Sequence, residues 1–200
     1  MIEERLLKSG LVSIAGVDEA GRGACAGPLV IAALILKDPK SSSLSMVRDS
    51  KELTPKAREE IVPVILENAR SHSIIEISPE EIDVHGLHKS NIDGMRRAIS
   101  ALDATPDYVL TDRYEIPGIS LPNLAIWKGD QVAITISAAS ILAKVHRDRV
   151  MISLDKRYPE YGFAEHKGYV TKVHNSALER VGVSPVHRKS YANIARLLER

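Results

Sequence analysis

The stretch that most constrains the fold of this chain is residues 12–28, VSIAGVDEAGRGACAGP. It begins with an apolar run, residues 12–17, which has the length and composition of a buried strand. Two adjacent carboxylates, Asp18 and Glu19, end the run, and a Gly-Arg-Gly turn follows at 21–23. Buried acids are costly to desolvate unless something binds them, and a divalent cation is the natural candidate. The stretch therefore predicts a strand that ends in two acids next to a ligand-binding turn.

The turn has the composition of a phosphate-binding loop. Gly21 and Gly23 let the backbone approach a ligand closely, and Arg22 supplies a fork of donors suited to phosphate. Together with the acids, these residues suggest metal-assisted phosphoryl chemistry. Two alternatives stay open: a tight turn with solvated acids, and a dinucleotide-binding loop. In the second case the glycines, which end at Gly27, run GxGxxxG and not the Rossmann GxGxxG.

Two further acids follow apolar runs in the same way. Asp112 follows residues 107–111, and Asp130 follows residues 124–127 after a Lys-Gly pair. If these runs are strands parallel to the first, their carboxyl ends meet at one edge of a sheet, and four carboxylates surround one point. Oxygen ligands favour Mg²⁺ or Mn²⁺, and two such ions about 3.5–4 Å apart hold both reacting oxygens of a phosphodiester. Taken singly, Asp112 and Asp130 are more readily explained as turn residues.

Composition bounds the class of protein. The 200 residues are 44% hydrophobic and 26% charged, which is ordinary for a globular domain. No apolar run reaches the roughly 20 residues that cross a bilayer, so no membrane span is expected. The one cysteine, Cys25, excludes an intrachain disulfide and favours a reducing cytoplasm.

The net charge of +1 hides an asymmetry along the chain. Residues 144–200 carry 12 Lys and Arg against 6 Asp and Glu, whereas residues 1–143 carry 15 basic and 20 acidic side chains. An acidic body with a basic end suits a metal site beside a polyanion-binding surface. The histidines of the basic part are candidates for phosphate contact: His146, His166, His174 and His187.

Periodicity and turn chemistry predict an α/β fold. The short link between the first two apolar runs favours antiparallel neighbours. Thr54 before Pro55 predicts a helix start, residues 84–90 a loop, and Ser90 with Asp93 the cap of a following helix. Further strands are expected at 28–36, 73–78, 107–111 and 124–127, and a long helix at 132–150.

The motifs taken together resemble bacterial ribonuclease HII, the type 2 ribonuclease H, over residues 16–191. The resemblance is carried by GVDEAGRG at 16–23, AGP at 26–28, DSKEL at 49–53, KGD at 128–130, ISAASILAKVHRD at 136–148 and YPEYGF with HKGY across 158–169. It implies a ribonuclease H-like mixed five-stranded sheet flanked by helices, with the first three strands antiparallel and the last two parallel to the first. The chain is then a single catalytic domain, 1–200, in which about 144–200 is a basic helical C-terminal extension.

The resemblance also implies roles for particular residues. Asp18, Glu19, Asp112 and Asp130 are expected to be the catalytic metal ligands. The turn of Gly21, Arg22 and Gly23 is expected to read the 2′-hydroxyl at the scissile position, Tyr169 to pack on the sugar at the RNA–DNA junction, and Lys51 to lie near the site. The chain departs from the family pattern at Arg113-Tyr114, where glycine often follows the third acid, and at Val170, where glycine often follows the tyrosine.

The implied activity is endonucleolytic cleavage of RNA in RNA–DNA hybrids, and of DNA duplexes 5′ of a single ribonucleotide, with two Mg²⁺ or Mn²⁺ ions. A cytoplasmic monomer is expected, and no sliding-clamp motif ends the sequence, which closes Ala-Arg-Leu-Leu-Glu-Arg. Two alternative functions stay open: a metal-independent nucleic-acid-binding module and a phosphatase of small substrates.

Overall fold

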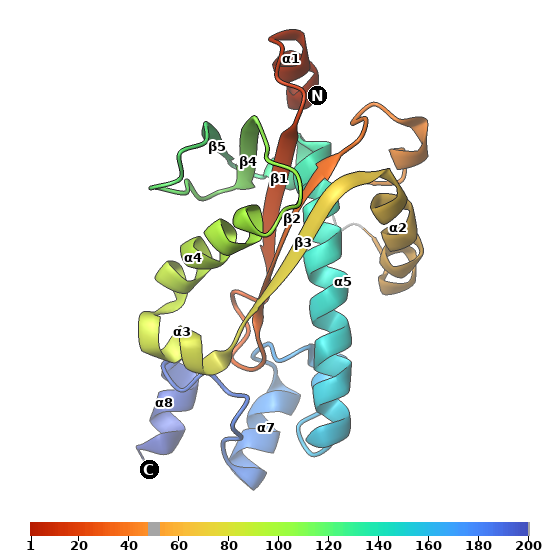
Figure 1. Cartoon of the computed structure of the whole chain (residues 1–200). Helices are drawn as coiled ribbons and strands as arrows, with labels where there is room; N and C mark the ends of the chain where they lie inside the picture. The colour runs from red at the N-terminus through yellow and green to blue at the C-terminus, as the bar shows by residue number, and fades with distance from the viewer. Residues whose placement is uncertain (48–52, 200) are drawn as a thin grey trace.

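A mixed five-stranded sheet forms the centre of the structure, a computed structural model that describes residues 1–47 and 53–199 (Figure 1). The strand order is β3-β2-β1-β4-β5. β1, β2 and β3 pair antiparallel, whereas β4 and β5 run parallel to β1. The strands are β1 (Ile14–Ala20), β2 (Leu29–Leu36), β3 (Ala69–Ile77), β4 (Tyr108–Asp112) and β5 (Asn123–Ile126). The predicted α/β class and all five strand directions are confirmed.

The first strand continues beyond the predicted run. Backbone pairing with β2 extends to Ala20 opposite Val30, so Asp18 and Glu19 lie inside β1 and not after it. The prediction ended the strand at its first charge, but main-chain hydrogen bonds do not depend on side-chain polarity. The acids are therefore held by the sheet itself.

Helices cover both faces of the sheet. α2 and α5 lie against one face and α4 against the other (Figure 1). The first core includes Leu34 of β2 and Ile65 of α2, and the second includes Ile31 of β2 and Met95 of α4. The helices are α1 (Ile2–Lys8), α2 (Pro55–Asn68), α3 (Pro79–His85), α4 (Leu87–Ser100), α5 (Ile134–Arg157), α6 (Phe163–His166), α7 (Lys172–Val181) and α8 (Ala192–Leu198), with short 3₁₀ turns η1 (Ser42–Leu44) and η2 (Gly129–Gln131).

One local prediction is confirmed and one is wrong. The Thr54 hydroxyl accepts from the Ala57 N–H, so Thr54 caps α2 as expected. Residues 84–90, however, are not a loop, because α3 ends at His85 and α4 begins at Leu87 with Gly86 between them. Ser90 is thus inside α4 and caps nothing.

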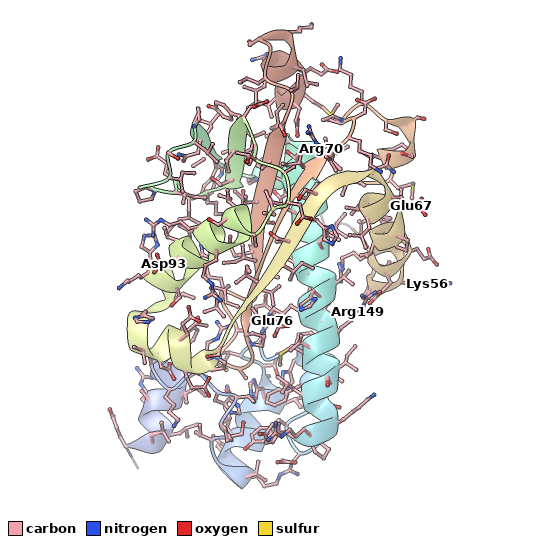
Figure 2. All side chains as sticks on the ribbon, in the orientation of Figure 1. Lys56, Glu67, Arg70, Glu76, Asp93 and Arg149 are labelled. Atoms are coloured by element: carbon pink, nitrogen blue, oxygen red, sulfur yellow. The ribbon has the colours of Figure 1, made fainter. Side chains whose placement is uncertain are left out.

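Two polar contacts between elements lie near the surface. Arg149 of α5 forms an ion pair with Glu59 of α2, and His146 of α5 lies 2.7 Å from Glu76 of β3. Figure 2 labels Arg149 and Glu76 among the surface side chains. Exposed pairs of this kind contribute about 0–1 kcal/mol each, so the two cores dominate stability. No helix among residues 1–47 and 53–199 has the length and apolar character needed to cross a membrane.

The helical C-terminal part packs on the turn that follows β1. α7 and α8 lie at the end of the molecule opposite the N-terminus (Figure 1). The Cys25 N–H donates to the Gly168 carbonyl over 3.0 Å, the Gly27 N–H to Val186 over 2.8 Å, and the Arg188 N–H to Cys25 over 2.9 Å. These contacts bind the basic part to the glycine-rich turn.

Candidate active site

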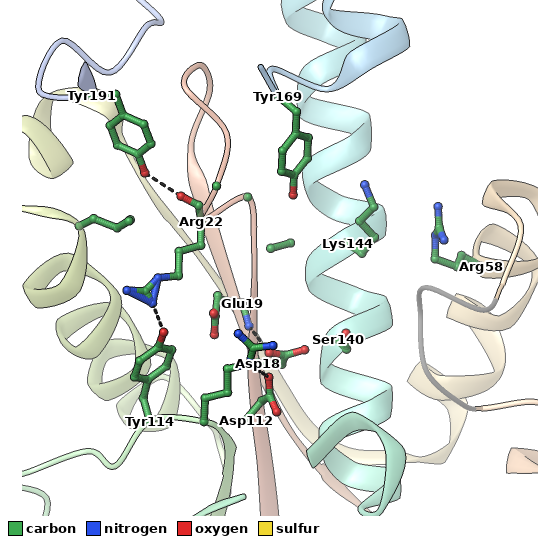
Figure 3. Close-up of a pocket in the computed structure, with 15 residues that line it drawn as sticks. Asp18, Glu19, Arg22, Arg58, Asp112, Tyr114, Ser140, Lys144, Tyr169 and Tyr191 are labelled. Atoms are coloured by element: carbon green, nitrogen blue, oxygen red, sulfur yellow. Dashed lines mark hydrogen bonds and ion pairs between the residues drawn. The ribbon is translucent and has the colours of Figure 1, made fainter. Parts of the chain in front are cut away.

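Three carboxylates meet where the central parallel strands end. In the pairing of β1 with β4, Val17 lies opposite Thr111, so Asp18 and Asp112 are the next residues on the two strands. Glu19 follows on β1, and its backbone N–H donates to Asp18 Oδ1 over 2.8 Å. All three acids line an open cleft of about 600 Å³ (Figure 3). Asp18, Glu19 and Asp112 thus share one cleft, and their action as a common set of metal ligands stays a prediction.

The two acids of β1 reach the cleft from opposite faces of the sheet, because successive side chains on a strand alternate. Asp18 is on the α5 side, where Ser140 hydrogen-bonds to it. Glu19 is on the α4 side, beside Arg22 (Figure 3). A ligand at the end of β1 thus meets one carboxylate from each layer.

Electrostatics in this cluster favour loss of negative charge. Burial, and then the charge of Glu19, raises the pKa of Asp18 well above its ordinary value. Burial and then the charge of Asp112 raise the pKa of Glu19 to about 7, although Arg22 and Arg113 oppose the shift. Desolvated like charges destabilise each other, and a bound cation would remove that cost.

The oxygen donors of this cluster are of the chemical type that a divalent metal ion prefers. Glu19 Oε2 is buried without a hydrogen-bond partner, which leaves an oxygen lone pair free to bind an ion. The cluster supplies only carboxylate oxygens, the ligands that Mg²⁺ and Mn²⁺ prefer. Asp112 Oδ2 lies 3.5 Å from Arg113 Nε, so this arginine forms an ion pair with the acid.

Asp130 is placed next to this cluster but outside its lining. It is buried in η2, and the neighbouring Gly129 N–H donates to Asp112 Oδ1 over 2.8 Å. Asp130 is not among the described residues that line the cleft. In the described part of the chain, no three His, Cys, Asp or Glu side chains are grouped closely enough to hold one ion. The four-carboxylate metal site therefore stays a prediction.

The glycine-rich turn forms the middle of the cleft. Gly21 has φ +93°, and a Cβ there would lie 1.8 Å from Arg147 Nε, so only glycine fits. The Arg22 guanidinium lies over the Tyr114 ring, 4.5 Å from its centroid, and donates to the Tyr114 hydroxyl (Figure 3). The Arg22 carbonyl accepts from Tyr191 over 2.7 Å. The turn is thus held from two sides.

Several residues that the sequence did not single out build this part of the cleft. Tyr114 and Tyr191 hold Arg22, and Tyr114 is one of the departures from the family pattern. Two fully buried arginines hold the backbone around the turn. Arg147 donates to the carbonyls of Pro28, Ala26 and Lys167, and Arg188 donates to the carbonyls of Gly27 and Arg22. Their buried role had no signal in the sequence, because an arginine in a basic segment reads as a surface cation.

Tyr169 lies at the end of the cleft away from the carboxylates (Figure 3). Its side chain is 38% exposed, and its ring lies 5.5 Å from the Arg147 guanidinium carbon. Gly23 faces the same ring, since a Cβ on Gly23 would lie 3.7 Å from the Tyr169 ring. The turn and Tyr169 therefore border one space, and their predicted contacts with the substrate stay a prediction.

Basic side chains line the remaining wall. Lys144 and Arg58 line the cleft on the α5 and α2 side (Figure 3), and both make ion pairs with Asp148, at 2.7 and 3.8 Å. With Arg22 and Arg113 they give the cleft positive charge around a carboxylate cluster, an arrangement suited to a polyanion with a metal ion. Lys51 lies outside the described residues.

The prediction of phosphate contacts for the C-terminal histidines is wrong for two of them. His174 and His187 are 0% and 1% exposed, so neither reaches a phosphate at the surface. Each is instead hydrogen-bonded inside the C-terminal part.

Comparison with known proteins agrees with this geometry. The sequence profile of the family described as ribonuclease HII matches residues 15–194. The chain belongs to the ribonuclease HII family. It is 51% identical over 199 residues to ribonuclease HII of Rhodococcus opacus, covering 100% of this chain and 88% of the relative, and 50% identical over 196 residues to that of Mycobacterium avium, covering 98% and 85%. The crystal structure of ribonuclease H2 from Pyrococcus horikoshii superposes with a TM-score of 0.81 at 28% identity, over 94% of this chain and 98% of that one.

Membership of the ribonuclease HII family fixes the class of chemistry. The chain is a type 2 ribonuclease H, a hydrolase and endonuclease that acts on RNA–DNA hybrids, and enzymes of its family depend on divalent metal ions. The cleft described above brings together Asp18, Glu19 and Asp112, the Gly-Arg-Gly turn and basic side chains.

Proposed function

We propose that this ribonuclease HII cleaves the RNA strand of RNA–DNA hybrids and also cuts duplex DNA on the 5′ side of a single embedded ribonucleotide, leaving 3′-hydroxyl and 5′-phosphate ends. One observation carries the proposal: Asp18, Glu19 and Asp112 share a cleft with the Gly-Arg-Gly turn and Tyr169. A cleft with metal-type acids at one end and an aromatic side chain at the other suits a nucleic-acid strand whose scissile phosphate lies between them.

The proposed cofactor is a pair of Mg²⁺ or Mn²⁺ ions held by Asp18, Glu19, Asp112 and Asp130. When bound, such a pair supplies an activated water and stabilises the leaving oxygen of the phosphodiester. The unpaired Glu19 oxygen supports this assignment for β1. For Asp130 the support is its position beside Gly129, which is hydrogen-bonded to Asp112.

Discrimination of RNA from DNA is assigned to the turn. The 2′-hydroxyl is the group that marks a ribonucleotide within DNA, and it both donates and accepts hydrogen bonds. Gly23 is exposed and has no side chain to screen its backbone, whereas Gly21 is buried against Arg147 and shapes the turn. Arg22 is fixed between them by Tyr114 and Tyr191. Tyr169 offers a ring edge and face to the neighbouring sugar, where a deoxyribose makes a flatter contact than a ribose.

The setting proposed for this activity is the cytoplasm, with the chain acting as a monomer in the removal of ribonucleotides and RNA primers. Cys25 is a free buried thiol, which is in keeping with a reducing compartment. The proximity of Lys51 to the site remains part of this proposal, on the strength of the DSKEL match alone.

The test is incubation of the purified chain with a DNA duplex that contains one ribonucleotide, in Mg²⁺ or Mn²⁺, with an all-DNA duplex of the same sequence as control. We expect one cut 5′ of the ribonucleotide, none in the all-DNA duplex, and none in EDTA. The Asp18→Asn variant should bind the duplex and fail to cut it. Equal cutting of both duplexes, or full activity of Asp18→Asn, would refute the proposal.

A further inference from the structure

A chain of buried polar groups runs beneath Tyr169. His174, on α7, and His187, in the segment between α7 and α8, lie with their Nε2 atoms 2.9 Å apart. His187 Nδ1 lies 3.1 Å from the Ser184 backbone N and 2.7 Å from the Ser184 hydroxyl. His174 Nδ1 lies 3.0 Å from the Tyr169 carbonyl oxygen. Four ring nitrogens thus connect a backbone N–H to the carbonyl of a residue that lines the cleft.

The two ends of this chain fix the position of every proton in it. The Ser184 backbone N–H only donates, so His187 Nδ1 accepts, and neutral His187 carries its proton on Nε2. That proton points to His174 Nε2, which must accept it. His174 then carries its own proton on Nδ1 and donates it to the Tyr169 carbonyl, which only accepts. Every hydrogen bond in the series is therefore donated in the same direction, from Ser184 toward Tyr169.

The same peptide segment is held at each of its neighbouring carbonyls. The Lys167 carbonyl accepts from Arg147 over 2.9 Å, the Gly168 carbonyl from the Cys25 N–H over 3.0 Å, and the Tyr169 carbonyl from His174. Three donors from three different parts of the chain therefore fix three consecutive peptide groups. The Tyr169 ring projects from this anchored segment into the cleft.

We propose that His174 and His187 are positioning residues for Tyr169, which act by holding its peptide in one orientation through a single pair of ring tautomers. The proposal rests on the proposed function in one respect, since it takes Tyr169 as a substrate contact. Neither histidine touches the cleft: neither is among the described residues that line it. Their effect on catalysis is therefore transmitted through the Tyr169 backbone.

The surroundings keep both rings neutral. His166 stacks on His174 with centroids 4.4 Å apart, Tyr161 and Phe163 pack around both rings, and Cys25 Sγ lies 3.7 Å from His174 Nδ1. Arg188 is the charged residue next to His187 in the chain. Burial lowers the pKa of His174 and, with the charge of His174, lowers that of His187 to about 4. A proton added to either ring would place two N–H donors opposite each other in this series of hydrogen bonds, and one hydrogen bond would be lost.

The first test reads the tautomers directly. Nitrogen-15 NMR of the imidazole rings in the full chain at pH 7 should show His174 protonated on Nδ1 and His187 protonated on Nε2. Either ring in the opposite tautomer, or charged at pH 7, would overturn the proposal. This measurement needs no substrate and no metal ion, so its result is independent of the proposed function.

The second test uses variants to measure the effect of this hydrogen bond on cleavage. His174→Leu should lower cleavage of a single-ribonucleotide duplex about tenfold, as expected for loss of a buried hydrogen bond, and should have no further effect when combined with Tyr169→Ala. His174→Asn, whose amide can donate from nearly the position of Nδ1, should restore part of the activity. Ile194→Ala, a truncation of an apolar side chain in the same C-terminal core that removes none of these hydrogen bonds, is the control for general loss of stability.

The outcomes separate the two proposals. If Tyr169→Ala leaves cleavage of the single-ribonucleotide duplex unchanged while the NMR tautomers are as stated, the substrate role of Tyr169 is wrong and the hydrogen-bond chain stands. If His174→Leu and Tyr169→Ala have additive effects, or if Ile194→Ala matches His174→Leu at equal loss of stability, the positioning role is wrong.

Discussion

Arg22 lies across the ring of Tyr114, with the guanidinium carbon 4.5 Å from the ring centroid and a hydrogen bond from the guanidinium to the tyrosine hydroxyl. The contact joins the glycine-rich turn after β1 to the residue that follows Arg113 beyond β4. It therefore couples the part of the cleft assigned to the 2′-hydroxyl with the end of the strand that carries Asp112.

Removal of the Tyr114 ring should weaken substrate binding. Tyr114→Ala releases Arg22, and we expect KM for a single-ribonucleotide duplex to rise by about three- to thirtyfold, the range of a partly buried cation–π contact with its hydrogen bond. Tyr114→Phe keeps the stacking and should show the smaller part of the effect. Steady-state kinetics on the three proteins checks this, and equal KM values in all of them would refute the role given to Tyr114.

The carboxylate cluster should destabilise the metal-free protein. Glu19→Gln removes a half-buried charge beside Asp18 and Asp112, so we expect the metal-free variant to melt about 2–4 °C above the wild type, the shift that about 1 kcal/mol gives in a chain of this size. Adding Mn²⁺ should raise the melting temperature of the wild type more than that of the variant. Calorimetry in EDTA and in Mn²⁺ tests both parts, and a variant that melts below the wild type in EDTA would contradict the electrostatic account.

Substitution of Tyr169 should lower activity on two substrates to different extents. Tyr169→Ala removes the ring that borders the turn, and the loss of activity should be greater on a duplex with one ribonucleotide than on a long RNA–DNA hybrid, in which a junction is not the main site of cutting. The expected difference is about tenfold in kcat/KM, typical for loss of a single stacking contact with a nucleotide. Equal losses on the two substrates would argue against a role at the junction.

The buried histidine pair should make stability depend on pH. The pKa of His187 is lowered to about 4 in the folded protein, so the unfolded chain binds more protons below its ordinary value of 6.5. Stability from this residue is fully present above pH 6.5 and is lost as the pH falls toward 4. Urea unfolding of the wild type and of His187→Gln between pH 4 and 7.5 should show a steeper decline for the wild type across that window.

One result of this unfolding experiment would contradict the role given to His187. If the two proteins lose stability in parallel between pH 6.5 and 4, His187 does not carry the depressed pKa that its burial implies. The loss of stability at low pH would then come from another buried group. The tautomers assigned to the hydrogen bonds between Ser184 and Tyr169 would also need revision.

Local sequence patterns predicted where the strands lie. The apolar run before Asp18 and the short link to β2 also predicted two antiparallel strands, whereas the parallel direction of β4 and β5 was implied by the resemblance to ribonuclease HII. The end of β1 was misplaced because its last residues are held by pairing with β2, which residue polarity does not reveal. The meeting of Asp18 with Asp112 followed from strand direction alone.

The support around the site could not be predicted in the same way. Arg147 and Arg188 act through contacts with carbonyls far away in the sequence, such as Pro28 for Arg147 and Gly27 for Arg188. The two buried histidines act through a contact with each other and through the Tyr169 carbonyl. In a basic segment, charge favours a surface location, and only the tertiary fold shows which cations are buried against backbone oxygens. Tyr114 was noted as a departure from a pattern, but its contact with Arg22 became visible only in three dimensions.

The central claim is that Asp18, Glu19, Asp112 and Asp130 bind a pair of divalent ions as one set. The most direct measurement is the number of Mn²⁺ ions bound per chain, followed by electron paramagnetic resonance, in the presence of the nicked product duplex, which cannot be cut again. The account predicts two ions for the wild type and fewer, or much weaker, binding for Asp112→Asn and for Asp130→Asn. An Asp130→Asn variant that binds Mn²⁺ with the stoichiometry and affinity of the wild type would contradict it.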